Sequence, residues 1–156
     1  MNLNDVIEHA RNRTYMGGIQ REENRVKITN EVFTPTSRVM TDLDKLPTIF
    51  FSNPSKTFQD QSCGDGQFLS EVLIRKLEHG IDFELALSTI YGVDLMPDNV
   101  KLCQDRLLCG RDDLRHIVEQ NIVCADALTY HYRFDGTDAE LSDYDKHTKD
   151  LGIEFV

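Results

Sequence analysis

The chain has 156 residues, which is about the size of one domain. Apolar residues make up 40% and charged residues 28%, so the composition excludes disordered, collagen-like and membrane proteins and predicts a buried core. Acidic residues outnumber basic ones by 27 to 17, and residues 79–156 carry 16 of these acids but only 7 of the bases. Because phosphate contacts need clustered Lys and Arg, we expect no tight binding to DNA without a basic partner.

The cysteines and the N-terminus indicate the cellular compartment of the protein. Four cysteines are present: Cys63, Cys103, Cys109 and Cys124. They form no C-x-x-C pair and have no His at zinc-ligand spacing, so we expect free thiols in a reducing cytoplasm and no metal site. Residues 1–10 contain two acids and no apolar run, and no 18-residue apolar stretch occurs. The sequence therefore predicts neither a signal peptide nor a membrane span.

The first predicted elements are two helices joined by a polar connector. Apolar residues over 3–10 recur at helical spacing, and Gly17 is expected to stop this leading helix. A second helix is predicted over about 36–46, with the Thr34 hydroxyl as its cap and Pro35 at its first position. We expect residues 1–30 to form this leading helix and the connector.

The central part of the chain alternates between strand and helix patterns. Strands are predicted over 56–62, 89–95 and 122–125. A glycine turn over 63–66 opens a helix that runs to Gly80, Asp82 caps a short helix over 83–88, and Pro97 begins another helix that ends before Gly110. The order β-α-β-α-β predicts an α/β fold with a parallel sheet.

Residues 129–156 are expected to form an acidic C-terminal segment. Tyr130, Tyr132 and Phe134 alternate with polar residues, which favours a half-buried edge strand over a base-stacking platform. Residues 152–156 have the pattern of a short closing strand, which would cover the edge of the first strand; otherwise that edge would pair with a second subunit.

Three strands are expected to end in acidic residues at one edge of the sheet. Asp60 is followed by the Gly64-x-Gly66 turn, Asp94 ends the second strand, and Asp126 follows the third. In a parallel sheet, a glycine turn lets backbone amides approach a ligand, and a carboxylate at the second strand can accept both ribose hydroxyls. Each feature alone is more often a tight turn or a helix cap. Their joint occurrence in this order favours a nucleoside-containing ligand.

Four segments resemble the S-adenosylmethionine-binding motifs of bacterial and phage adenine-N6 DNA methyltransferases. They are NEVFTP at 30–35, FQDQSCGDGQFL at 58–69, IYGVD at 90–94 and NIVCADAL at 121–128. The resemblance implies a Rossmann-like class I methyltransferase domain over residues 31–128, with a mainly parallel and abbreviated sheet.

The resemblance also implies roles for individual residues. Phe33, Thr34 and Pro35 would flank the methionine part of the cofactor. The segment from Asp60 to Gly66, with Ser62, Cys63 and Gly64, would hold its amino and carboxylate groups. Asp94 and Leu95 would contact the ribose and one adenine face, and Asp126 would accept from the adenine amino group beside Ala127. The family usually has Pro and Ala where this chain has Gln61 and Ser62, which is expected to loosen the loop.

The catalytic motif of this family is absent from the 156 residues. The family uses an Asn or Asp followed by two prolines and an aromatic to bind the flipped base, and the four prolines here are never adjacent. Asn53-Pro54 is the segment most similar to this motif, but it lies too few residues before the first strand to end a separate parallel strand. The catalytic residues therefore stay unidentified. The alternative to an enzyme is a non-catalytic cofactor-binding or anti-restriction module that acts on a partner methyltransferase through the sheet edge.

Overall fold

The computed structural model describes residues 1–12 and 34–136. It contains a parallel sheet of three strands, β1 (Phe58–Asp60), β2 (Ile90–Asp94) and β3 (Ile122–Cys124), in the order β1-β2-β3. Gly92 pairs with Asp60 on one side and with Ile122 on the other. The predicted parallel α/β arrangement is therefore confirmed as a small, mixed helix and strand structure.

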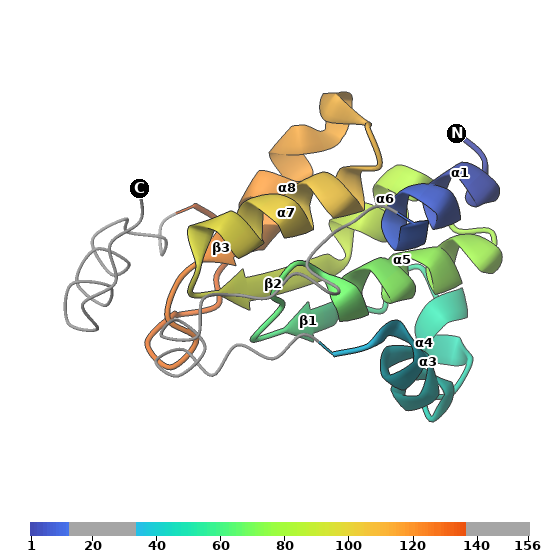
Figure 1. Ribbon diagram of the computed structural model, residues 1–156, viewed down its shortest axis with the longest axis horizontal. Helices are drawn as coiled ribbons and strands as arrows, with labels where there is room; N and C mark the ends of the chain where they lie inside the picture. Colours follow the sequence, from blue (N-terminus) through green and yellow to red (C-terminus); the bar gives the residue numbers. More distant parts are fainter. Residues whose placement is uncertain (13–33, 137–156) are drawn as a thin grey trace.

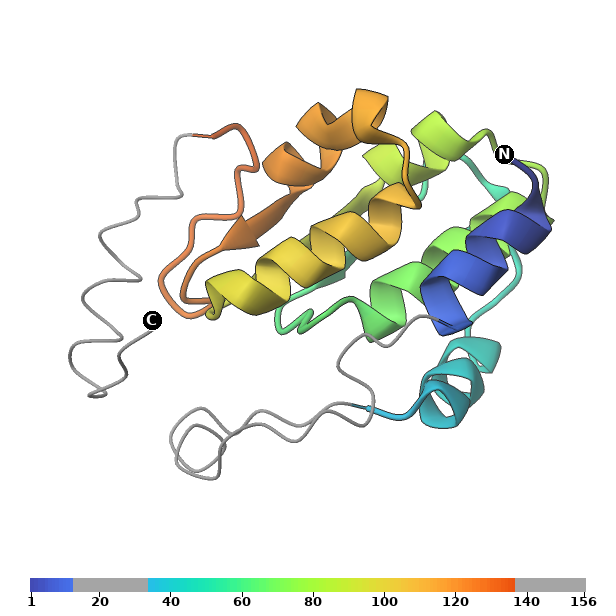
Figure 2. The same cartoon turned by 45° about the horizontal axis from the view of Figure 1, so that its top comes forward.

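The helices cover mainly one face of this sheet. They are α1 (Leu3–Ile7), α3 (Thr36–Asp44), α4 (Ile49–Ser52), α5 (Gln67–Glu78), α6 (Phe83–Ser88), α7 (Pro97–Leu108) and α8 (Arg115–Asn121), with a π-helical segment at Glu8–Asn12 and a 3-10 turn at Asp112–Leu114. The crossover helices α5 and α7 lie side by side over the sheet, as both views show (Figure 1, Figure 2). None of the helices in the described ranges is long and apolar enough to cross a membrane.

Alternation along the strands divides the apolar residues into two clusters. Ile90 and Ile122 belong to the main core beneath α5 and α7, whereas Val93 and Val123 point to the other face of the sheet. Both faces of β2 are thus buried, as expected of an inner parallel strand. The outer strand β1 has no strand on its other side among residues 1–12 and 34–136.

An aromatic loop covers the second face of the sheet. Tyr130 and Phe134 are buried there, and their rings pack edge to face with centroids 5.4 Å apart. Tyr132 and Phe134 have positive φ values of 57° and 51°, and the Tyr132 hydroxyl donates to the Ala127 carbonyl at 2.6 Å. The predicted edge strand is therefore wrong, because all three rings fold back onto Val93 and its neighbours instead of alternating.

The leading helix is confirmed: α1 covers Leu3–Ile7, and the π-helical segment Glu8–Asn12 continues it. Asn2 and Asp5 form a reciprocal capping box at the start of α1. The π-helical segment that follows is held to the core by Arg11, whose guanidinium pairs with the buried carboxylate of Glu71 at 2.7 Å. Arg106 of α7 donates from Nε to the Ala10 carbonyl at 2.9 Å. These bonds dock the N-terminus onto α5 and α7.

Other boundaries differ from the sequence-based expectations. Helix α3 has Pro35 as its N-cap with no side-chain hydrogen bond, so the predicted Thr34 cap is wrong. The strand predicted over 56–62 is reduced to Phe58–Asp60, because Ser62 already lies in the turn after the strand. Helices α4 and α8 were not predicted. The predictions for Gly17 and for a strand over 152–156 lie outside the described residues.

Candidate site at the carboxyl ends of the strands

The loops that follow the three strands meet at one edge of the sheet. The amide of Cys63 donates to the Val93 carbonyl at 2.9 Å, and the amide of Ala125 donates to the Asp94 carbonyl at 3.0 Å. These backbone bonds lie just beyond the regular ladder of the sheet. They place the glycine loop, the end of β2 and the end of β3 next to one another.

Asp94 connects the glycine loop to helix α7. Its Oδ2 atom accepts from the Gly64 amide at 3.0 Å, and its Oδ1 atom accepts from the Met96 amide at 2.9 Å and from Asn99 Nδ2 at 3.2 Å. The carboxylate also lies just before the N-terminus of α7, where the helix dipole favours a negative charge. Asp94 is therefore held in a defined orientation.

The glycine loop needs glycine at its last position. Gly66 has a φ of 89°, which L residues rarely adopt, and it forms the N-cap of α5. A Cβ atom at this position would lie 2.9 Å from Cys103 Sγ on α7. Gly66 thus permits both the turn and the close approach of α5 and α7.

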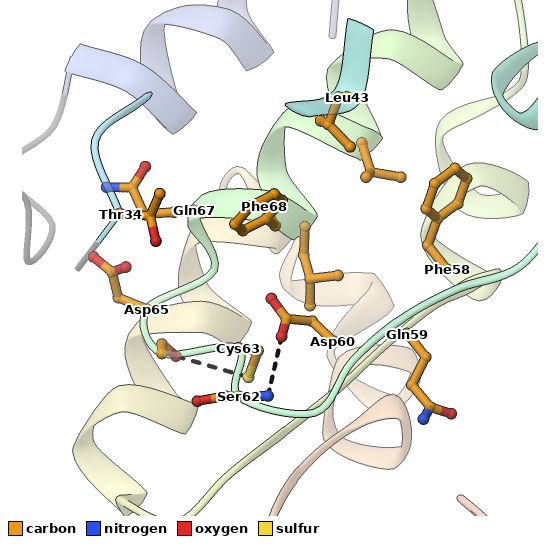
Figure 3. Close-up of a pocket in the computed structure, with 13 residues that line it drawn as sticks. Thr34, Leu43, Phe58, Gln59, Asp60, Ser62, Cys63, Asp65, Gln67 and Phe68 are labelled. Atoms are coloured by element: carbon orange, nitrogen blue, oxygen red, sulfur yellow. Dashed lines mark hydrogen bonds between the residues drawn. The ribbon is translucent and has the colours of Figure 1, made fainter. Parts of the chain in front are cut away.

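A pocket of about 270 Å³ lies between the outer edge of β1, helix α5 and helix α3 (Figure 3). The apolar part of its lining consists of Leu43, Phe58, Phe68, Leu69 and Val72. The rest is mainly polar and comes from Thr34, the strand residues Gln59 and Asp60, the turn residues Ser62, Cys63, Gly64 and Asp65, and Gln67 at the start of α5. This lining suits a ligand that has both an apolar chain and polar end groups.

Asp60 is one of two carboxylates in the lining of this pocket, the other being Asp65. In Figure 3 Asp60 points toward Phe68, while its Oδ1 atom accepts from the Ser62 amide at 3.0 Å. Burial raises the pKa of Asp60 above its usual value, with the Ser62 hydrogen bond acting in the opposite direction. A ligand cation in the pocket would compensate this cost of burial and favour the ionised carboxylate.

A buried ion pair supports the rear of the glycine loop. Asp65 and Arg106 are both almost fully buried, and Arg106 Nη1 lies 3.5 Å from Asp65 Oδ1. Arg106 Nη2 also donates to Gln67 Oε1 at 3.2 Å, and the Thr36 hydroxyl donates to the same oxygen at 3.4 Å. Helices α3, α5 and α7 are therefore joined at Gln67, which also lines the pocket.

The cysteines near the site are free thiols with little tendency to ionise. The hydrogen bond with Cys103 and the burial of the thiol raise the pKa of Cys63 well above its ordinary value. Burial and the nearby carboxylates of Asp94 and Asp98 raise the pKa of Cys124 to about 12. Because the thiolate is the nucleophilic form, these cysteines have the character of packing residues.

The structure brings together only part of the predicted site. The predicted residues that line the pocket are Thr34, Asp60, Ser62, Cys63 and Gly64. Gly66 and Asp94 belong to the same loop region through their contacts with α5 and Gly64. Pro35 is the N-cap of α3, and Phe33 lies outside the described residues.

The remaining predicted residues follow β2 and β3 and do not line the pocket. The carboxylate of Asp126 accepts from the Leu128 amide at 2.9 Å, and its carbonyl accepts from Tyr130, so it also caps its own turn. Ala127 is half-buried beside the aromatic loop, and Leu95 accepts a hydrogen bond from the Cys124 thiol. These residues therefore lie at the same carboxyl edge of the sheet, after β2 and β3 and outside the pocket.

Sequence reasoning missed two groups of residues at this edge. Asn99 could have been noticed from its place on the first turn of the helix after Asp94, but no motif marked it. Leu43 lines the pocket because α3 packs against α5, which a pattern along the chain does not reveal, and Phe58 lines it from β1. Among the described residues, no group of three or more His, Cys, Asp or Glu side chains is arranged to hold a metal ion.

Comparisons of this chain with protein-family models, with curated proteins and with solved structures found no match.

Proposed function

We propose that this chain binds S-adenosylmethionine at the carboxyl edge of its sheet, as the cofactor-binding part of an adenine-N6 DNA methyltransferase. The observation that carries the proposal is the 3.0 Å hydrogen bond from the Gly64 amide to Asp94. It joins the glycine loop to the acid at the end of the second strand, which are the two features of a nucleoside-binding α/β edge. The order β1-β2-β3, with α5 and α7 on one face, supports a Rossmann-like class I domain.

The two ends of the cofactor would contact different parts of this edge. The pocket beside β1 would take the methionine end, because Asp60 offers a carboxylate to its ammonium group and Phe68 offers an apolar wall to its side chain. Asp94 would accept from the ribose hydroxyls. Asp126, Leu95 and Ala127 would contact the adenine. When bound, the cofactor supplies an electrophilic methyl group.

This chain's own residues would bind and orient the cofactor but not the methyl acceptor. No Asn-Pro-Pro-aromatic motif occurs in the sequence, and Asn53, the nearest echo, accepts from the Ser55 amide at 2.9 Å in a turn before β1. We propose that DNA is reached only with the help of a basic partner that supplies the acceptor site. This role is consistent with the net charge of −10.

Calorimetric titration with S-adenosylmethionine and with its demethylated product tests the proposal. We expect saturable binding of both, at micromolar concentrations. ATP, which contains the same adenosine without methionine, is the matched control. It should bind more weakly, because its negatively charged phosphates would lie near the Asp60 carboxylate in place of the methionine ammonium group. Absence of binding by both methionine-containing ligands would contradict the proposed function.

One observation favours a second candidate, a non-catalytic module that pairs with another methyltransferase. The Phe58 amide donates at 2.9 Å to the carbonyl of Thr89, the residue just before β2. Because successive residues of a strand direct their backbone groups to opposite sides, those of Gln59 point away from β2. Within the described ranges no strand pairs with this outer edge, and such edges add strands from other chains. Sedimentation of the chain with and without a purified adenine-N6 methyltransferase distinguishes a complex from two independent proteins.

A further inference from the structure

We propose that Asn99 is a positioning residue that orients Asp94 for selection of a ribose over a deoxyribose. This inference rests on the proposed function, because it assigns a task to Asp94 in binding the nucleoside. Asn99 is the third residue of α7 and only 1% exposed, so its side-chain amide is directed inward at the edge of the sheet.

The geometry around Asp94 shows how the amide acts. Asn99 Nδ2 donates to Asp94 Oδ1 at 3.2 Å, and the Met96 amide donates to the same oxygen at 2.9 Å. Two donors on one oxygen fix the rotation of the carboxylate about its Cβ–Cγ bond, a torsion that is otherwise broad for aspartate. The other oxygen, Oδ2, is thereby directed toward the Gly64 amide and the glycine loop.

This orientation matters for a ligand with two adjacent hydroxyls. A ribose offers two donors at a fixed separation, and a carboxylate accepts both only when its plane is aligned with them. Without the Asn99 amide, Asp94 keeps the Met96 and Gly64 amides, one on each oxygen, but its carboxylate plane is held less firmly. A less firmly held plane weakens the bond to the second hydroxyl more than it weakens the contacts to the rest of the ligand. Asn99 therefore affects the discrimination between ribose and 2′-deoxyribose more than it affects overall affinity.

Asn121 provides a matched control at the other end of β3. It is also buried, and its Nδ2 atom donates to the Ser88 carbonyl at 3.2 Å. It is the last residue of α8 and directly precedes β3, so it lies at the end of the strand opposite to the site. Loss of its amide removes a comparable buried hydrogen bond without touching Asp94.

The test is calorimetry with S-adenosylhomocysteine and its 2′-deoxy analogue on the full chain. For the wild type we expect a preference for the ribose form of about tenfold or more, as a hydrogen bond to a charged group implies. Asn99→Ala should reduce this preference to about two- or threefold, and Asn99→Asp, which keeps the shape but replaces the donor by an acceptor, should do the same. Asn121→Ala should lower the melting temperature and leave the preference unchanged.

The outcomes separate this inference from the function on which it rests. If the wild type binds neither ligand, both proposals are overturned. If it binds both ligands equally, the cofactor site stands, but Asp94 does not select the ribose and the role of Asn99 is refuted. If it prefers the ribose form and both Asn99 variants keep the full preference, only the role of Asn99 is refuted.

Discussion

Gly92 and Cys63 face each other so closely that a methyl group on Gly92 would lie 3.0 Å from Cys63 Sγ. The same added Cβ atom would lie 2.9 Å from Leu69 Cδ1 on α5. Gly92 is in the middle of β2, so any side chain here would push the strand away from the glycine loop and the helix at once. The close approach of the loop to β2 is what allows Gly64 to reach Asp94.

We therefore expect Gly92→Ala to destabilise the protein by about 1–3 kcal/mol through overpacking. Urea denaturation monitored by circular dichroism measures this loss. The matched control is Gly92→Ala in a Leu69→Ala background, where one of the two contacts is removed. There the glycine substitution should cost clearly less than in the wild type, and equal costs in both backgrounds would contradict the packing explanation.

Asp94→Ala should weaken binding of S-adenosylmethionine by about 1–3 kcal/mol, because hydrogen bonds from the ligand to a charged acceptor are lost. Titration calorimetry on the folded variant gives this value. Asp105→Ala is the control, since Asp105 is also on the α7 side of the molecule but pairs with Arg115 at 3.2 Å. Equal affinities of wild type and Asp94→Ala would remove Asp94 from the binding site.

The purified chain alone should transfer no methyl groups to DNA above background. The reason is that none of its residues replaces the missing motif that orients the adenine amino group. Transfer of a tritiated methyl group to unmethylated DNA tests this, with an active adenine-N6 methyltransferase as the positive control. Robust turnover would show that another residue performs this task, and Asn53→Ala would be the first variant to examine.

Lys76 should make the stability of the protein rise with pH on the alkaline side. Its side chain is 0% exposed, and its Nζ atom donates to the Lys56 carbonyl at 2.6 Å and to the Thr89 hydroxyl at 2.8 Å. Burial lowers the pKa of Lys76 below the ordinary value of 10.5. Between these two pKa values the folded protein binds fewer protons than the unfolded chain, so stability increases with pH in that window.

The comparison of wild type with Lys76→Met isolates this effect. The difference in unfolding free energy between them should grow in favour of the wild type as the pH rises toward 10.5. A difference that stays constant over this range would mean that burial does not perturb this lysine.

Local patterns along the chain were sufficient to predict most of the secondary structure. The caps and stops around α6 and α7, namely Asp82, Pro97 and Gly110, act within a few residues, so the sequence shows them directly. The alternation of strand and helix patterns likewise predicted a parallel sheet, because short crossovers leave few other topologies. The same reasoning failed for Tyr130, Tyr132 and Phe134, whose alternation indicates a strand while their rings gain more burial by folding back onto Val93.

The sequence by itself determined which residues lie at the carboxyl ends of the strands, since each strand end is marked by its own acid or glycine. Only the tertiary structure decided how they relate: that Asp94 is bonded to Gly64 and Asn99, that Asp65 is paired with Arg106, and that the pocket lies beside β1. These contacts join residues of different elements. Their geometry depends on how closely α3, α5 and α7 pack, which is a property of side-chain volumes across the core and not of any local run of sequence.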